Sequence, residues 1–386
     1  MRSPLIARRY WDEELNPMMT VFASKGKYDD VIDLSIGDPD IPTLPGIIEA
    51  AFADARLGHT KYTDPRGYLE LREEICRFYE EEYGVPVTPD RVFVTASGCA
   101  AMYLVLQAIL NEGEEVIIPE PYFSIYPDQV RLCGGVPVTL PTYQSEGFRI
   151  DIPRLEQLLT PKTRAIILNS PNNPSGACLT TENMEEIAAF CKAHDVLVLA
   201  DDIYTNFCYQ QPFTPILALP GMAERTVVIN SFSKNFIMTG FRIGNIVAPP
   251  EIASTVQRIN ESVIYCAPSI SQRAALWALR HRSEIEPEIL EIFRRRITSA
   301  AGQMNAMNKM SVLPPQGSIY LFPDVSATGM SSMEVCRRLL DEAHVLTLPG
   351  IAFGASGEGH LRIACTVSEE RMAEALERVR RTGLMD

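Results

Sequence analysis

A lysine set among hydroxyl groups and an arginine is the feature of this 386-residue chain that most clearly suggests chemistry. Lys234 follows Ser231 and Ser233, and Arg242 comes eight positions later. Residues 225–230, largely β-branched and apolar, predict a buried strand just before them. Hydroxyls and an arginine can hold a phosphate, and a lysine amine can attack a carbonyl. Together they favour pyridoxal phosphate, a phosphorylated aldehyde held as a Schiff base on Lys234; the alternative is a solvated surface lysine.

Polar groups that suit the same cofactor follow two other predicted strands. Asp201 ends the apolar run 196–200, where a buried carboxylate needs a cationic partner such as a protonated pyridine nitrogen. Tyr204 and Asn173 could hydrogen-bond the 3′ oxygen of the ring. The alternatives are a helix N-cap for Asp201 and a simple turn at 173–176. Ligands bind at the carboxyl ends of parallel strands, so we expect these groups to meet at one edge of a sheet.

A predicted helix opens with Gly98, Cys99 and Ala100, directly after the strand-like run 92–95. Its exposed backbone N–H groups and its dipole would suit the phosphate of the cofactor. Because such a contact needs only backbone amides, Cys99 need not be a nucleophile. A glycine before a helix is otherwise typical of a tight turn.

The segment 231–244 resembles the S-x-S-K-x-x-x-x-x-G-x-R-x-G pattern of class I and II aminotransferases, which use pyridoxal phosphate and have fold type I. The D-x-x-Y element at 201–204 and the N-P-S-G element at 173–176 also resemble cofactor-binding segments of that family. Asp202 departs from the glutamate often found there, but we expect its side chain to point away from the ring. The resemblance extends over nearly the whole chain in the expected order.

Four further roles rest on the resemblance. It implies that Phe123 stacks on the pyridine ring and that Tyr62 reaches the phosphate of a neighbouring subunit, so that a homodimer shares its active sites. It also implies that Gly37 approaches the substrate carboxylate through its backbone and that Arg362 clamps this carboxylate bidentately. Without the resemblance, Phe123 would be a core residue, Tyr62 a turn residue and Arg362 a solvent-facing residue.

Short apolar runs alternate with helical patterns from about residue 91 to 248. Strands are predicted at 92–95, 115–118, 165–168, 196–200 and 226–229, and helices at 100–110 and 183–193. Because these strands are apolar without alternation, they should be buried on both faces of a mainly parallel α/β sheet. Further along, helices are predicted at 287–310, with Pro287 at the start, and at 332–343, and strand-like runs at 318–322 and 360–364.

The resemblance turns this pattern into a fold prediction. It implies an α/β fold of type I, in which a large cofactor-binding domain, 45–284, holds a mainly parallel seven-stranded sheet between helices. It also implies a smaller α+β domain built from both chain ends, 1–44 and 285–386. The pattern of apolar residues alone would not have joined these two ends.

Composition excludes several other classes of protein. The net charge of −14 argues against nucleic acid or an anionic membrane surface as a partner. Nine cysteines without a C-x-x-C pair and five unclustered histidines predict neither a disulfide framework nor a metal site. The first residues lack an apolar signal-peptide core, and no stretch is apolar enough to span a membrane, so we expect a cytoplasmic protein.

The predicted reaction is a two-step transamination between an L-amino acid and a 2-oxo acid, with ping-pong kinetics. Lys234 would hold the cofactor and then act as general base, Asp201 would stabilise the electron-rich ring, and Tyr204 would tune the Schiff base. The same residues suit a cysteine-S-conjugate β-lyase, because both reactions start from one carbanion. The acidic charge disfavours a non-catalytic pyridoxal phosphate sensor with a DNA-binding module. Apolar residues around Ile36 and Phe123 weakly favour aromatic or aliphatic substrates.

Overall fold

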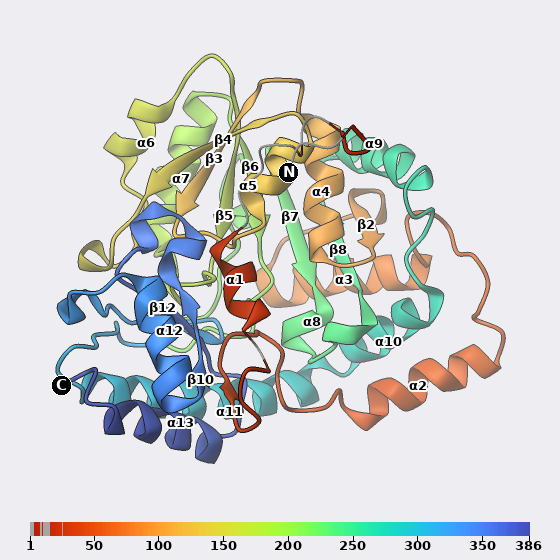
Figure 1. The fold of residues 1–386 in the computed structure, drawn as a ribbon. Coiled ribbons are helices and arrows are strands. Elements are labelled where there is room, and N and C mark those ends of the chain that lie inside the picture. The colour runs from red at the N-terminus through yellow and green to blue at the C-terminus, as the bar shows by residue number, and fades with distance from the viewer. Residues whose placement is uncertain (1–3, 8–9, 11–15, 25) are drawn as a thin grey trace.

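A seven-stranded sheet forms the centre of the protein, whose computed structural model describes residues 4–7, 10, 16–24 and 26–386 (Figure 1). Its strands are β2 (Val92–Thr95), β3 (Glu115–Glu120), β4 (Val136–Pro141), β5 (Thr163–Asn169), β6 (Leu197–Asp201), β7 (Thr226–Ser231) and β8 (Gly244–Val247). Their order across the sheet is β2-β8-β7-β6-β5-β3-β4. Strand β8 runs antiparallel to both of its neighbours, and the other neighbouring pairs are parallel. The prediction of a mainly parallel seven-stranded sheet is therefore confirmed.

Both faces of this sheet are buried, because successive strand residues point into two different apolar clusters. Ile117 and Val228 belong to the cluster that includes buried residues of α2 (Pro45–Arg56), α3 (Leu69–Tyr83), α7 (Thr181–Ala193) and α10 (Ser269–Arg280). Val116 and Val227 belong to the cluster that includes residues of α4 (Gly98–Ile109), α5 (Tyr126–Leu132) and α9 (Pro250–Glu261). The sheet thus lies between two layers of helices.

An N-terminal and a C-terminal segment of the described chain pair beside this sheet (Figure 1). Strand β1 (Ile32–Asp33) pairs in parallel with β10 (Val345–Leu346), and a second small sheet has the order β11 (Leu348–Pro349), β12 (Leu361–Ala364), β9 (Tyr320–Leu321). A separate apolar cluster joins β1 to α11 (Arg282–Asn305), α12 (Ser332–Ala343) and α13 (Glu369–Arg381). We propose the domain division 45–284 and 1–44 with 285–386, which this pairing and this cluster support. The remaining helices are α1 (Pro17–Ala23), α6 (Ile152–Leu158) and α8 (Phe232–Asn235).

The predicted elements are present, but the sequence analysis left other elements unpredicted, including two strands of the large sheet, and misplaced one helix. The sequence did not predict β4 or β8. Strand β4 contains two prolines, which are tolerated because it lies at the edge of the sheet. The predicted helix 287–310 is wrong at both ends, since α11 begins at Arg282, contains Pro287 and ends at Asn305. Pro287 deprives the helix of one N–H donor, while the buried side chains of Ile285 and Ile289 hold it in place.

Candidate active site

A cavity of about 340 Å³ opens at the carboxyl ends of three neighbouring parallel strands. The last residues of β5, β6 and β7 (Asn169, Asp201 and Ser231) all line it. Twelve of the fourteen predicted site residues line it as well: Gly37, Gly98, Cys99, Phe123, Asn173, Asp201, Tyr204, Ser231, Ser233, Lys234, Arg242 and Arg362. Ala100 and Tyr62 are the two that do not.

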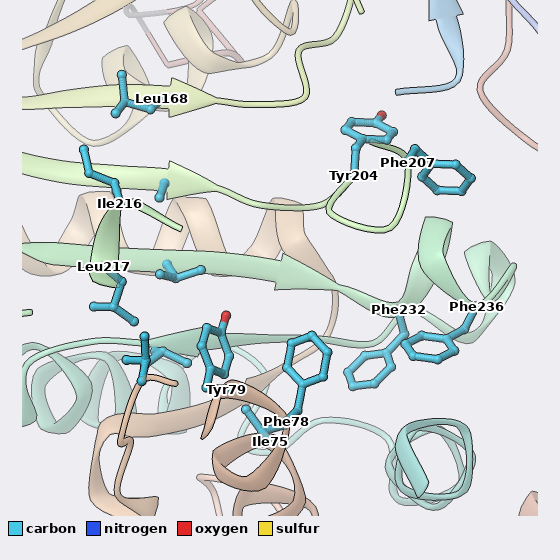
Figure 2. Packing of buried hydrophobic residues seen from close by; sticks show 14 of the residues in the cluster. Ile75, Phe78, Tyr79, Leu168, Tyr204, Phe207, Ile216, Leu217, Phe232 and Phe236 are labelled. Carbon is cyan, nitrogen blue, oxygen red and sulfur yellow. The ribbon is translucent and has the colours of Figure 1, made fainter. Parts of the chain in front are cut away.

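Lys234 is positioned by the short helix α8, which begins directly after β7. The Oγ of Ser231 accepts a hydrogen bond from the backbone N–H of Ser233 (3.2 Å) and so caps this helix. Two other residues of the segment, Phe232 and Phe236, stack at 5.6 Å in the buried cluster (Figure 2). With these rings anchored in the core, the half-buried Lys234 reaches the cavity, where its Nζ donates to the backbone carbonyl of Gly37.

Asp201 lies at the bottom of the cavity and is only 4% exposed. Tyr126 donates its hydroxyl hydrogen to Oδ2 of this carboxylate, whereas Oδ1 has no hydrogen-bond partner among the described residues. Burial raises the pKa of Asp201 to about 6, against the lowering effects of Tyr126 and of the nearby backbone N–H of Ile203. An unpaired oxygen on a buried carboxylate is costly, so the site is suited to a cationic N–H donor.

Two polar residues hold the loops around Asp201. The side-chain amide of Asn169 donates to the backbone carbonyl of Asp201 (2.9 Å), and its oxygen accepts from the backbone N–H of Asn173 (2.8 Å). Asn173 is 3% exposed, and Tyr204, on the loop beyond β6, is 6% exposed (Figure 2). As expected, Asp202 is buried but does not line the cavity.

Arg362 lies in β12 and is 4% exposed, so it is not the solvent-facing residue that its strand pattern allowed. Its Nη1 donates to Oδ1 of Asn173 (3.2 Å) and its Nη2 to the backbone carbonyl of Ser35 (2.5 Å), while Nε has no hydrogen-bond partner in the part of the chain that the structure describes. Burial lowers the pKa of Arg362, although Tyr320 and Tyr204 act in the opposite direction. Because the described residues provide no carboxylate partner, this guanidinium is suited to an anionic ligand.

A third group of residues surrounds the first turn of α4. Backbones approach closely there, since a Cβ added to Gly244 would lie 2.9 Å from the backbone nitrogen of Gly98. Arg242, just before β8, has a left-handed backbone conformation (φ 53°) and is exposed at the mouth of the cavity. The backbone N–H of Ala100 donates to the Oγ of Ser97 (3.2 Å), and Ala100 does not line the cavity.

Tyr62 lies on the surface, 84% exposed, with its ring against Tyr265 at 5.2 Å. Within one subunit it therefore has no place in the cavity. Phe123 does line the cavity, with its ring edge-on to Tyr126 at 5.6 Å.

Sequence reasoning gave no role to Asn169, Tyr126 or Tyr320, which the structure brings into the cavity. Asn169 was detectable, because it ends a predicted strand just as Asp201 does. Tyr126 and Tyr320 had no such signal, since each lies in an apolar run that resembles core.

Two kinds of site are not found. No group of three or more His, Cys, Asp or Glu side chains that could hold a metal ion occurs in the described ranges. Nor does any helix among the described residues have the length and apolar character needed to cross a membrane.

Comparison with known proteins supplies the family. A model of aminotransferase class I and II matches residues 29–379. The chain is 41% identical to the putative aminotransferase YugH of Bacillus subtilis, over 91% of each chain, and 37% identical to the aromatic-amino-acid aminotransferase 2 of Thermococcus litoralis, over 90% of each. A mutant of Thermus thermophilus aspartate aminotransferase superimposes with a TM-score of 0.93 at 33% identity, covering 99% of this chain and 100% of the other. The chain belongs to the class I and II aminotransferase family.

Proposed function

We propose that this protein transfers an amino group from an L-amino acid to a 2-oxo acid with pyridoxal phosphate bound at Lys234. The observation that carries the proposal is that one cavity joins a lysine amine, a buried carboxylate with an unpaired oxygen and a buried arginine without an acidic partner. The family membership and the aminotransferase names of the relatives support it.

The described residues fit this cofactor. Oδ1 of Asp201 would accept the N–H of a protonated pyridine ring, and Asn173 and Tyr204 would hydrogen-bond the ring oxygen. The N-terminus of α4 at Gly98 and Cys99, with the hydroxyls of Ser231 and Ser233 and the charge of Arg242, would hold the phosphate. The ring of Phe123 would cover one face of the pyridine.

The residues divide the chemistry among them. Pyridoxal phosphate supplies an aldehyde for the amine and a ring that accepts the electrons of a broken Cα–H bond. Lys234 would hold the cofactor, and its free amine would act as the general base that takes the proton from Cα of the bound amino acid. Asp201 keeps its negative charge beside the ring nitrogen, and Arg362 orients the substrate carboxylate. The same groups serve the 2-oxo acid in the second half of the reaction, so ping-pong kinetics are expected.

A half-reaction experiment tests this proposal. Enzyme loaded with pyridoxal phosphate is mixed with one amino acid at a time and no acceptor. Transamination predicts one equivalent of 2-oxo acid per subunit and no free ammonia. Continuous release of ammonia would instead indicate β-elimination, and no reaction with any amino acid would contradict the proposal.

We also propose that the enzyme is a homodimer in which Tyr62 contacts the phosphate of the partner's cofactor. The exposure of this tyrosine, and of Val263, Ile264 and Tyr265 on a neighbouring segment, supports a subunit contact on this face. The hydroxyl of Tyr62 would add one hydrogen bond to a charged phosphate, which is typically worth ~1.5–3 kcal/mol.

A further inference from the structure

Two aromatic rings hold the guanidinium group of Arg362. Its central carbon lies 4.6 Å from the ring centre of Tyr320 and 4.9 Å from that of Phe353. Together with the hydrogen bonds to Asn173 and Ser35, these rings fix the plane of the guanidinium. The group next to this fixed cation is therefore well placed to take part in binding an anion.

Tyr320 is that group. It is 3% exposed, and it lines the cavity from β9. Its hydroxyl occupies the space where a side chain on residue 37 would lie, so Gly37 is needed to make room for it. The hydroxyl oxygen accepts a hydrogen bond from Tyr204 (3.3 Å), but among the described residues its own hydrogen has no acceptor.

The charges around this hydroxyl favour an anionic acceptor. Burial alone would raise the pKa of Tyr320, but the positive charges of Lys234 and Arg362, together with the hydrogen bond from Tyr204, outweigh burial and lower it. A more acidic O–H is a stronger hydrogen-bond donor. Hydrogen bonds to charged groups are also about twice as strong as neutral ones.

We propose that Tyr320 binds the substrate, by donating its hydroxyl hydrogen to one oxygen of the carboxylate that Arg362 holds. This inference rests on the proposed function, because it takes an amino or oxo acid to be the ligand of Arg362.

The test measures binding of unreactive carboxylates to the cofactor-loaded enzyme by calorimetry. Maleate and 3-phenylpropanoate serve as probes, one with a second carboxylate and one with an apolar group, because the preferred side chain is not known. Tyr320→Phe keeps the ring under Arg362 and removes only the hydroxyl. This change should lower the affinity for whichever probe the wild type binds. The expected loss is about 10- to 150-fold, the usual effect of losing a hydrogen bond to a charged group.

Tyr209→Phe is the matched control. Tyr209 donates its hydroxyl to the backbone carbonyl of Ser318 (2.6 Å), two residues from Tyr320, and does not line the cavity. This variant loses a tyrosine hydroxyl that is bonded to the segment leading into β9, so it reports any general loosening of β9. Its affinity for the probes should stay within about twofold of the wild type.

The outcomes separate this inference from the proposed function. If the wild type and Tyr320→Phe bind the probes equally well, the inference about Tyr320 is overturned. It is also overturned if Tyr209→Phe loses as much probe affinity as Tyr320→Phe. Weaker cofactor retention in Tyr320→Phe with unchanged probe affinity would also overturn it, because Tyr320 would then act only through Tyr204. If the wild type transaminates and Tyr320→Phe binds the probes normally, only the role of Tyr320 is refuted, and the proposed function stands. A wild type that binds neither cofactor nor probe refutes both proposals.

Discussion

Two buried charged residues without a charged partner define the chemistry at the scale of single residues. Asp201 leaves one oxygen unpaired, and Arg362 has no acidic partner among the described residues. Each costs the protein free energy, because a buried charge loses its hydration. A ligand that brings a cation to the first and a carboxylate to the second recovers that free energy, which is why we assign the ring nitrogen and the substrate carboxylate to these groups.

The raised pKa of Asp201 predicts how pH affects the cofactor-free protein. The folded-state pKa of about 6 lies above the ordinary value of 3.8, so the folded state binds more protons between these values. Stability should therefore fall as pH rises through this window. The Asp201→Asn variant has no carboxyl group at this position, so this change of stability with pH is absent from it. Relative to that variant, wild type should lose about 2 kcal/mol of unfolding free energy between about pH 4 and about pH 8.

Denaturant unfolding at fixed protein concentration measures this difference. Subtracting the Asp201→Asn values removes the part of the contribution of Asp202 that comes from burial, which is the main cause of its raised pKa; the smaller part that comes from the charge of Asp201 stays with the wild type. Loading with pyridoxal phosphate should reduce the loss of unfolding free energy with rising pH, since the ring nitrogen then pairs with Asp201. If the unfolding free energies of the two cofactor-free proteins change with pH in parallel, then burial does not raise the pKa of Asp201.

At this scale the sequence predicted the site residues that belong to recognisable motifs. It missed the residues that contact those motif residues. Lys234, Asp201 and Arg362 stood in patterns that resemble a known family, and all three line the cavity. Tyr126 and Tyr320 come from apolar segments, and their hydroxyls reach the site only because of tertiary packing. A single tyrosine in an apolar run is usually a core residue, so the sequence alone could not separate these two cases.

At the scale of elements, the site depends on strand ends that lie side by side. Strands β5, β6 and β7 bring Asn169, Asp201 and Ser231 to one edge because their pairing is parallel. Asn169 lies opposite Asp201, and Ser231 lies two residues beyond Ile229, the residue opposite Asp201 in β7. The sequence predicted these strands from their continuous apolar character. It could not predict β8, whose four residues follow the Arg242 motif directly and carry no separate strand signal.

The start of β8 provides a test of how closely the elements around the phosphate site must pack. A Cβ on Gly244 would lie 2.7 Å from the backbone oxygen of Asn230 and 2.9 Å from the backbone nitrogen of Gly98. Because backbone atoms cannot move aside cheaply, Gly244→Ala should destabilise the protein by about 1–3 kcal/mol and weaken cofactor binding. Thermal unfolding and fluorescence titration with pyridoxal phosphate measure the two effects.

Gly240→Ala is the control for this prediction. Gly240 lies in the same segment between Lys234 and β8, and an added Cβ there would meet nothing within 4 Å. It should therefore keep nearly normal stability and cofactor affinity. Equal behaviour of the two variants would show that the contact between β8 and α4 is not needed for the site.

At the scale of the whole molecule, the described subunit leaves Tyr62 outside its own cavity. If the partner subunit receives this tyrosine, Tyr62→Phe should weaken pyridoxal phosphate affinity by roughly 10- to 150-fold without unfolding the protein. Equilibrium dialysis at several cofactor concentrations gives this affinity.

Mixed dimers of Tyr62→Phe and Lys234→Ala subunits distinguish contact within a subunit from contact between subunits. With contact between subunits, one site carries both changes and the other carries none, so half of the sites should bind the cofactor normally. With contact inside one subunit, every site carries one change. Failure of verified mixed dimers to recover normal binding, or full activity of a dilute monomer, would rule out a shared site.

Identification of the lysine that carries the cofactor tests the central claim most directly. The loaded enzyme is reduced with borohydride, digested, and mapped by mass spectrometry, with Lys234→Arg treated in parallel. The account predicts a single pyridoxyl-modified peptide that contains Lys234, and no modified peptide from the variant. Modification at another lysine, or a loaded enzyme that carries none, would contradict it.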